Sequence, residues 1–390
     1  MKPLPLAGLL IVSLEQAVAA PFATRQLADL GARVIKVERD TGDFARAYDS
    51  KVNGLASYFV WLNRNKESVV LDLKSEEGVA VLRNIVAKAD VFVQNLAPGA
   101  VERLGLGGEA ALELNPRLVH VSISGYGRGG PYEQKKAYDL LVQCEAGLLS
   151  VTGTPEAPAK SGISIADIAA GMYAYTGVLT ALLQRSASGR GDILEISMLE
   201  ALSEWMSQPY FYAEYGGVQQ PRSGAEHATI APYGPFDTAN GSIFFGIQNE
   251  AEWAKFCETV LADPAVAADP RFAGNALRVE NRPELHARIA QTLNRLDSVE
   301  VLSRLDAAGI ANAELRDMRG LSAHPQLAAR RRWQDVSSPA GPVRSLIPPV
   351  TSRSTGFRMD GIPALGAHTT AVLSEFASDR RGSLSVKEAP

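Results

Sequence analysis

The first two hundred residues alternate short runs of aliphatic and β-branched residues with segments of helical periodicity, which leaves few possible architectures. The apolar runs are nearly continuous, as expected for strands that are covered on both faces of a sheet. Strands that alternate with helices in this way form a parallel sheet wrapped by helices. The predicted strands are residues 8–14, 33–38, 68–73, 90–96 and 118–124, and residues 76–89 form one intervening helix.

The length of 390 residues is more than one ordinary compact domain contains, so the sequence predicts two domains. A passage rich in glycine and proline, residues 216–235, separates the alternating region from a shorter segment of mixed helices and strands. We therefore expect a large α/β domain, a linker and a small α+β domain. Their predicted bounds are residues 1–200, completed by 330–390, then 201–235, and finally 236–329.

The charge pattern and the cysteines exclude several classes of protein. The formal net charge is −4, with both signs mixed along the chain, so no basic stripe predicts a nucleic-acid partner. Cys144 and Cys257 lie far apart in unlike contexts, which is typical of reduced thiols in a cytoplasmic protein. Residues 1–20 superficially resemble a secretory signal. A better interpretation is a short buried strand over residues 9–12, followed by a helix over residues 21–31. No membrane partner is expected.

Several common catalytic motifs are also missing from the sequence. The turn after the first strand lacks the glycine fingerprint of a dinucleotide site, which disfavours NAD and FAD. No Gly-x-Ser-x-Gly elbow occurs, and the five histidines lack the spacing of metal ligands, so no metal site is predicted. A glycine-rich run over residues 124–132 follows a strand and is interpreted either as a mobile turn or as a ligand-contacting loop.

Asp167 is the one acidic residue in the stretch SGISIADIAAGMY, at the point where an apolar helix begins. Aspartate is a favoured N-cap and gains from the helix dipole, so capping is its simplest role. The same physics predicts a low pKa and an ionised carboxylate, which is the state that a covalent nucleophile needs. The two interpretations are compatible.

Five long segments in order resemble family III CoA-transferases, the CaiB/BaiF family, over nearly the whole chain. The first segment contains the predicted strand 33–38 and the motif Glu-x-x-x-Gly-Asp at residues 38–43, and the fifth segment contains Asp167. The C-terminal half is similar more loosely, through residues 309–327 and 365–369, where Ala311-Asn312 replaces the usual Pro-Cys or Pro-Ala step. The five segments are residues 31–46, 63–78, 91–106, 114–153 and 161–202.

This resemblance implies a Rossmann-like parallel sheet in the large domain, a smaller α+β domain and an interlocked homodimer in the cytoplasm. It also implies a CoA-transferase without a permanently bound cofactor, whose substrates are an acyl-CoA thioester and a carboxylic acid. Asp167 takes the place of the catalytic aspartate. By resemblance, it attacks the thioester to form an anhydride, CoA converts this to an aspartyl-CoA thioester, and an acceptor carboxylate then receives the CoA.

The resemblance further implies a set of CoA contacts spread over the large domain. Arginine and lysine would bind the CoA phosphates, and leucine would pack on the adenine. The glycine-rich lid of the family corresponds to residues 227–235, which contain few glycines. The implied CoA contacts are Gln16, Ala17, Arg39, Leu71, Lys74, Asn95, Leu96, Arg103, Lys136 and Tyr138.

Two alternative functions stay open at this level. The related α-methylacyl-CoA racemases place a His-Asp pair where this chain has Tyr138-Asp139, and a glutamate near Gln248. Tyrosine and glutamine are poor proton carriers near neutral pH, which disfavours racemization. A noncatalytic CoA-binding subunit is the second alternative, and the presence of Asp167 argues against it.

The sequence favours a small dicarboxylic acyl group as substrate. Hydroxyl and cationic side chains close together in the sequence could bind its second carboxylate, namely those of Tyr210, Tyr212, Tyr215, Arg222 and His227.

Overall fold

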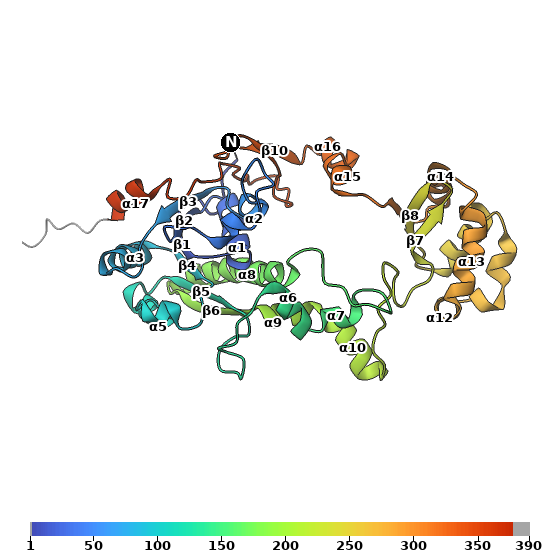
Figure 1. Ribbon diagram of the computed structural model, residues 1–390, viewed down its shortest axis with the longest axis horizontal. Helices are drawn as coiled ribbons and strands as arrows, with labels where there is room; N and C mark the ends of the chain where they lie inside the picture. The colour runs from blue at the N-terminus through green and yellow to red at the C-terminus, as the bar shows by residue number, and fades with distance from the viewer. Residues whose placement is uncertain (1, 377–390) are drawn as a thin grey trace, which may run out of the picture. The chain divides into compact units, whose positions relative to one another are not determined.

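A computed structural model describes residues 2–376 and divides the chain into two compact units (Figure 1). The described part of the large unit comprises residues 2–146, 161–207 and 327–376. The small unit comprises residues 147–160 and 208–326, so it takes in a short segment from the predicted large domain. The predicted linker is divided between the two units. The assignment of the large domain to CoA binding stays a prediction.

The large unit contains a six-stranded sheet with the order β3-β2-β1-β4-β5-β6, in which every neighbouring pair is parallel. This confirms the predicted parallel α/β architecture. Strand β1 pairs with β2 on one side and β4 on the other, which is the point where the strand order of a doubly wound sheet reverses. The strands are β1 (Leu10–Leu14), β2 (Arg33–Glu38), β3 (Lys66–Val70), β4 (Val91–Gln94), β5 (Val119–Ser124) and β6 (Asp192–Ser197).

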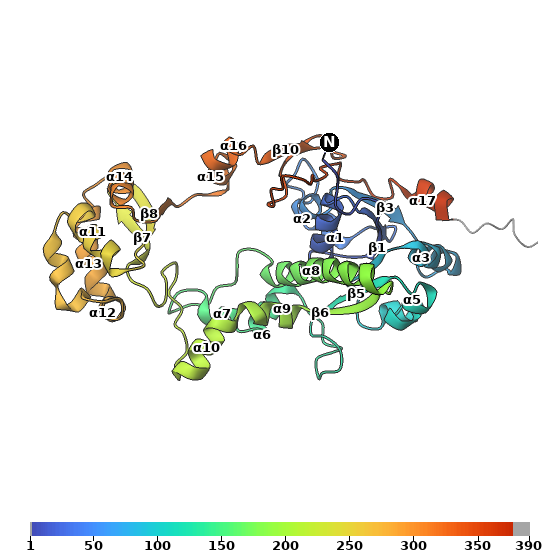
Figure 2. The ribbon, with the colours of Figure 1, turned by 180° about the vertical axis from the view of Figure 1, so that it is seen from behind.

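Helices cover both faces of this sheet (Figures 1 and 2), which explains the continuous apolar runs. Ile11 faces the cluster built by α1 (Ala19–Asp29) and α8 (Ile165–Ser188), whereas Val12 faces α3 (Glu76–Lys88). Successive strand residues thus enter opposite cores. The other helices of this unit are η1 (Phe44–Ala47), α2 (Ser57–Leu62), α4 (Ala100–Arg103), α5 (Gly108–Leu114), α6 (Asp139–Glu145), α9 (Met198–Trp205) and α17 (Thr369–Phe376).

Helix α8 is the one helix among the described residues that is long and apolar enough to cross a membrane. Its alanines at 169, 170 and 174 are fully buried against the sheet, so its apolar composition serves the core of the large unit.

Strand β3 begins at Lys66, before its predicted range, and ends at Val70. Ser75 caps α3 by accepting a hydrogen bond from the Gly78 N–H, and the residues between belong to a loop.

The small unit is built on a three-stranded antiparallel sheet with the order β7-β8-β9. Phe245 and Ile243 on β8 pack with Leu285 and Leu305 from the helices that cover this sheet. A separate hairpin, which belongs to the large unit, joins β10 (Trp333–Val336) to β11 (Val343–Leu346). The elements of the small sheet and its helices are β7 (Tyr233–Thr238), β8 (Gly241–Gly246), β9 (Asn312–Glu314), α11 (Glu250–Lys255), η2 (Phe256–Val260), η3 (Pro264–Ala268), η4 (Pro270–Phe272), α12 (Asn275–Glu280), α13 (Arg282–Leu293) and α14 (Ser298–Ala308). The remaining helices are α7 (Leu148–Val151), α10 (Ser207–Gly216), α15 (Met318–Ser322) and α16 (Pro325–Ala329).

Candidate active site

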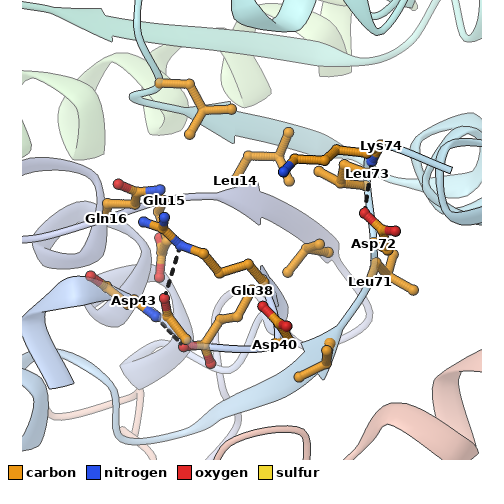
Figure 3. A pocket seen from close by; sticks show the side chains of 15 residues that line it. Leu14, Glu15, Gln16, Glu38, Asp40, Asp43, Leu71, Asp72, Leu73 and Lys74 are labelled. Atoms are coloured by element: carbon orange, nitrogen blue, oxygen red, sulfur yellow. Dashed lines mark hydrogen bonds between the residues drawn. The ribbon is translucent and has the colours of Figure 1, made fainter.

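A cavity of about 560 Å³ opens at the carboxyl ends of strands β1, β2 and β3 (Figure 3). Ligands of doubly wound sheets bind outside the carboxyl ends of the strands, next to the reversal of strand order. Here the reversal lies between β1 and β4, and Leu96 after β4 also lines the cavity. The lining residues are Leu14, Glu15, Gln16, Val37, Glu38, Arg39, Asp40, Gly42, Asp43, Val70, Leu71, Asp72, Leu73, Lys74 and Leu96.

Half of the implied CoA contacts line this cavity. Leu71 is buried, whereas Arg39 and Lys74 are exposed, so the cavity combines an apolar wall with cations in contact with water. That combination suits a ligand with an aromatic ring and phosphate groups. The implied contacts that line it are Gln16, Arg39, Leu71, Lys74 and Leu96.

Asn95 contributes by holding the backbone of Gln16. Its Oδ1 accepts a hydrogen bond from the Gln16 N–H at 2.9 Å, and its Nδ2 donates to the Gln16 carbonyl at 2.9 Å. Because both amide groups of the Asn95 side chain are engaged, this residue fixes the loop after β1 to the end of β4. The resemblance marks Asn95 as a ligand contact, and the structure gives it a positioning contact as well.

Three other implied contacts do not line the cavity. Arg103 ends α4, Lys136 lies in the segment before α6, and Tyr138 directly precedes that helix. All three side chains are exposed. None of the three lines the cavity, and their roles stay predictions.

Ala17, in the loop after β1, has a left-handed backbone with φ of 60°. This conformation costs a residue with a Cβ about 1–2 kcal/mol. Asp43 stabilises the turn, because its Oδ1 accepts hydrogen bonds from the N–H groups of Ala17 at 3.2 Å and Ala45 at 2.9 Å. The other carboxylate oxygen of Asp43 accepts a hydrogen bond from Lys36 Nζ at 2.7 Å.

A buried network of charges lies beneath this turn. The side chains of Glu15, Lys36, Asp43 and Lys66 are all fully buried, and Lys66 Nζ donates to Glu15 Oε1 at 2.6 Å. Burial opposes ionisation of Glu15, but the neighbouring Lys66 and Lys36 outweigh it and lower the pKa of the Glu15 carboxyl. Burial is also the main reason that the pKa of Lys66 falls to about 8. The sequence analysis missed this network, although Lys36 interrupts the otherwise apolar centre of strand β2.

Asp167 is the third residue of α8 and is not its cap, which corrects the expectation from the sequence. Asp139 Oδ1 accepts hydrogen bonds from the N–H groups of Ala166 at 2.8 Å and Asp167 at 3.4 Å. The expected low pKa is also wrong. Burial, and next the charge of Asp139, raise the pKa of the Asp167 carboxyl to about 7, although a hydrogen bond from the Ala19 N–H opposes them.

Gly171 explains how α1 comes so close to Asp167. A Cβ at this position would lie 2.6 Å from the Ala19 carbonyl oxygen and 3.0 Å from the Phe22 ring. Only glycine permits this approach between the two helices. Because Ala19 follows the Gln16–Ala17 turn, its hydrogen bond to Asp167 connects the carboxylate directly to the loop beside the cavity.

Tyr48 was missed by the sequence analysis and lies near the same carboxylate. Partial burial, followed by the charges of Asp43 and Asp167, raises the pKa of the Tyr48 hydroxyl to about 12. The hydroxyl therefore stays protonated at neutral pH and is available as a hydrogen-bond donor. Its ring contacts Tyr58 and Phe44, at 5.5 and 5.7 Å between ring centroids.

The residues that suggested a dicarboxylic substrate do not line one cavity, although Tyr210, Tyr212 and Tyr215 share helix α10. In the small unit, a cavity of about 510 Å³ is lined by His227 but by none of Tyr210, Tyr212, Tyr215 and Arg222. The Arg222 guanidinium donates to the carbonyls of Thr154 at 2.9 Å and Pro155 at 2.8 Å. The structure therefore does not assemble these side chains into one carboxylate site.

Comparison with known proteins decides the class of protein. The sequence matches CoA-transferase family III over residues 6–369. The chain belongs to this family. Succinyl-CoA:glutarate CoA-transferase of Homo sapiens is 33% identical to this family III CoA-transferase over 95% of the chain and 86% of the human protein. Acetyl-CoA:oxalate CoA-transferase of Acetobacter aceti is 32% identical over 96% of each chain.

A solved structure supports the same assignment. A CaiB/BaiF family protein from Brucella suis superimposes with a TM-score of 0.86 and 31% identity, over 96% of this chain and 100% of that one. The resemblance stated from the sequence is thereby confirmed, and the chain is an enzyme of the CoA-transferase class. The racemase and the noncatalytic subunit receive no support from these relatives. Among residues 2–376, no group of three or more His, Cys, Asp or Glu side chains could hold a metal ion.

Proposed function

We propose that this family III CoA-transferase moves CoA between small dicarboxylic acids, with Asp167 as the covalent nucleophile. The observation that carries the proposal is the position of the Asp167 carboxylate. It accepts a hydrogen bond from the Ala19 N–H, three residues after the Gln16 loop that lines the cavity. The relatives named for glutarate and oxalate support the choice of dicarboxylic acids.

The first half-reaction transfers CoA to the enzyme. An oxygen of the ionised Asp167 attacks the thioester carbonyl, the carbon–sulfur bond breaks, and CoA leaves as a thiolate. The product is a mixed anhydride between Asp167 and the acyl group. The thiolate then attacks the Asp167 carbonyl carbon of that anhydride, which releases the donor acid as a carboxylate and leaves an aspartyl-CoA thioester.

The second half-reaction follows the same steps in reverse order. The acceptor carboxylate attacks the aspartyl thioester and releases the CoA thiolate, and the thiolate attacks the acceptor carbonyl of the new anhydride. Asp167 leaves as a carboxylate, so atoms and charge balance over the cycle. Each intermediate preserves the energy of the thioester, and the proposal therefore needs neither ATP, a metal nor a permanently bound cofactor. Water must be excluded because it would hydrolyse either anhydride.

Substrate identity is tested with a panel of donors and acceptors. Succinyl-CoA and acetyl-CoA are each combined with oxalate, succinate, glutarate, mesaconate and a monocarboxylate control, and CoA products are measured by mass spectrometry. We expect transfer to at least one dicarboxylate, at a kcat/KM above that for the monocarboxylate. Deuterium uptake at the α-carbon of a 2-methylacyl-CoA, without transfer between any pair, would instead establish racemization.

The cavity makes a separate prediction about CoA binding. Arg39→Ala and Lys74→Ala are each expected to raise KM for the acyl-CoA about tenfold with little change in kcat, because each removes a charge-assisted contact to phosphate. Lys51→Ala removes an exposed lysine of the same unit that does not line the cavity, and serves as the matched control. Initial rates at varied acyl-CoA concentration measure the effect. An unchanged KM in both variants would place the CoA phosphates elsewhere.

We further propose a cytoplasmic, interlocked homodimer, supported by the resemblance to the family. Sedimentation equilibrium should give twice the chain mass of 41.7 kDa. An interlocked dimer should stay dimeric when the folded protein is diluted, because its chains cannot separate without unfolding. A dimer that dissociates freely on dilution, or a monomer, would contradict interlocking.

A further inference from the structure

We propose that Asp139 is a positioning residue of the transfer reaction, which caps helix α8 in place of Asp167 and so leaves the Asp167 carboxylate free to react. The inference rests on the proposed role of Asp167 as nucleophile, and it adds a second aspartate whose function is not chemical attack. The argument starts from the hydrogen bonds at the beginning of α8.

The first N–H groups of a helix have no acceptor within the helix and must find one elsewhere. Ser164 occupies the capping position of α8, but its side chain makes no capping hydrogen bond. Asp139 Oδ1 instead accepts hydrogen bonds from the N–H groups of Ala166 at 2.8 Å and Asp167 at 3.4 Å. A residue from α6 therefore supplies the cap of α8.

Asp139 is itself held in place by Gln143, one helical turn later on α6. The fully buried Gln143 donates from Nε2 to Asp139 Oδ2 at 2.6 Å, and its Oε1 accepts a hydrogen bond from the Ser161 N–H at 2.9 Å. These two side chains attach α6 both to the start of α8 and to the segment before it. The Asp139 carboxylate thus has a defined position beside Asp167.

The polar groups near Asp167 come from three elements. The Asp139 carboxylate lies on α6, the Ala19 N–H on α1, and the neighbouring Tyr48 hydroxyl follows η1. Asp139 is the one carboxylate among these three groups. Burial and this negative charge both raise the pKa of Asp167.

The like charges have a chemical consequence for the first step. When Asp167 attacks the thioester, the negative charge moves from its carboxylate to the leaving thiolate. The repulsion between Asp167 and Asp139 therefore decreases as the new carbon–oxygen bond forms, which favours the transition state over the ground state. A carboxylate with a raised pKa is also a stronger nucleophile once it is ionised.

The test compares Asp139→Asn with Glu145→Gln. Asparagine keeps an acceptor oxygen for the helix cap but removes the charge, whereas Glu145→Gln removes an exposed charge at the other end of α6. We expect Asp139→Asn to lower the midpoint of the acidic limb of kcat/KM by about one pH unit and to reduce kcat about tenfold at pH 8. The control should keep both values.

A second readout does not depend on turnover. Carbodiimide labels protonated carboxyl groups, so labelling of Asp167 against pH, measured by peptide mass spectrometry on the resting enzyme, reports its titration. The midpoint should fall in Asp139→Asn and in Asp139→Ser, which also keeps an acceptor oxygen without the charge. An unchanged midpoint in either folded variant would overturn the role of Asp139. Full turnover by an Asp167→Asn enzyme would instead overturn the proposed nucleophile, so the two failures are distinguishable.

Discussion

An Asp167→Asn enzyme is expected to lose kcat by about 10⁴-fold or more, the largest effect of any substitution considered, because an amide cannot act as the covalent nucleophile. Asparagine has nearly the volume of aspartate and keeps an oxygen for the hydrogen bond from the Ala19 N–H. The loss would therefore report chemistry rather than a change of fold. Initial rates of CoA transfer measure the effect, and Asp192→Asn at the start of β6 is the matched control.

The thermal stability of the same variant should depend on pH in a defined direction. The folded-state pKa of Asp167 is about 7, against an ordinary value of 3.8, so the folded protein binds this proton more tightly than the unfolded chain. The contribution of Asp167 to stability is present below pH 4 and is lost as the pH rises towards 7. Asparagine removes this loss. The variant should thus have a Tm at pH 8 equal to or above that of the unaltered enzyme, and a clearly lower Tm would contradict the burial of a charge here.

A Lys36→Met enzyme is expected to lose about 3–5 kcal/mol of unfolding free energy, since removing Lys36 leaves the buried Asp43 carboxylate without its cation, while Glu15 keeps Lys66. Lys36 Nζ lies 2.7 Å from Asp43 Oδ2 and 3.5 Å from Glu15 Oε1, and all three side chains are fully buried. For a cooperative unit of the size of the large unit, the loss corresponds to a decrease in Tm of about 6–20 °C. Because Asp43 also holds the Ala17 turn, KM for the acyl-CoA should increase as well.

Arg33→Met is the matched control for Lys36→Met. Arg33 lies on the same strand, but its side chain is 36% exposed and its ion pairs with Glu67 and Glu375 are both accessible to water. Exposed pairs of this kind contribute at most about 1 kcal/mol. Differential scanning calorimetry of the two variants compares the losses directly. A similar, small loss in both would show that the buried network does not stabilise the large unit.

The parallel sheet could be predicted because its strands are buried on both faces. Ile11 and Val12 enter different cores, so neither face required a polar residue and the runs remained recognisable. Strand β3 was placed less well, because Lys66 at its start is charged and gave no apolar signal. Its burial depends on Glu15, which follows another strand and is 51 residues away in the sequence.

The position of Asp167 could be predicted, but its electrostatic environment could not. The helix start and the ordered motifs both marked this residue. Its raised pKa depends on Asp139, which lies 28 residues earlier and reaches α8 only in the folded chain. A local pattern assigns the cap to the nearest aspartate, whereas the structure gives that role to the more distant one. Tyr48 was missed for the same reason, since its proximity to Asp167 is tertiary.

The most direct test of the central claim is to trap the covalent enzyme. The enzyme is incubated with succinyl-CoA in the absence of an acceptor acid, quenched in acid and digested with trypsin. Cleavage after Lys160 and Arg185 releases residues 161–185, in which Asp167 is the only acidic side chain. We predict that this peptide gains the mass of CoA less one water and that the adduct disappears when an acceptor is added. Rapid CoA transfer with this peptide unmodified, or with the adduct on another residue, would contradict the account.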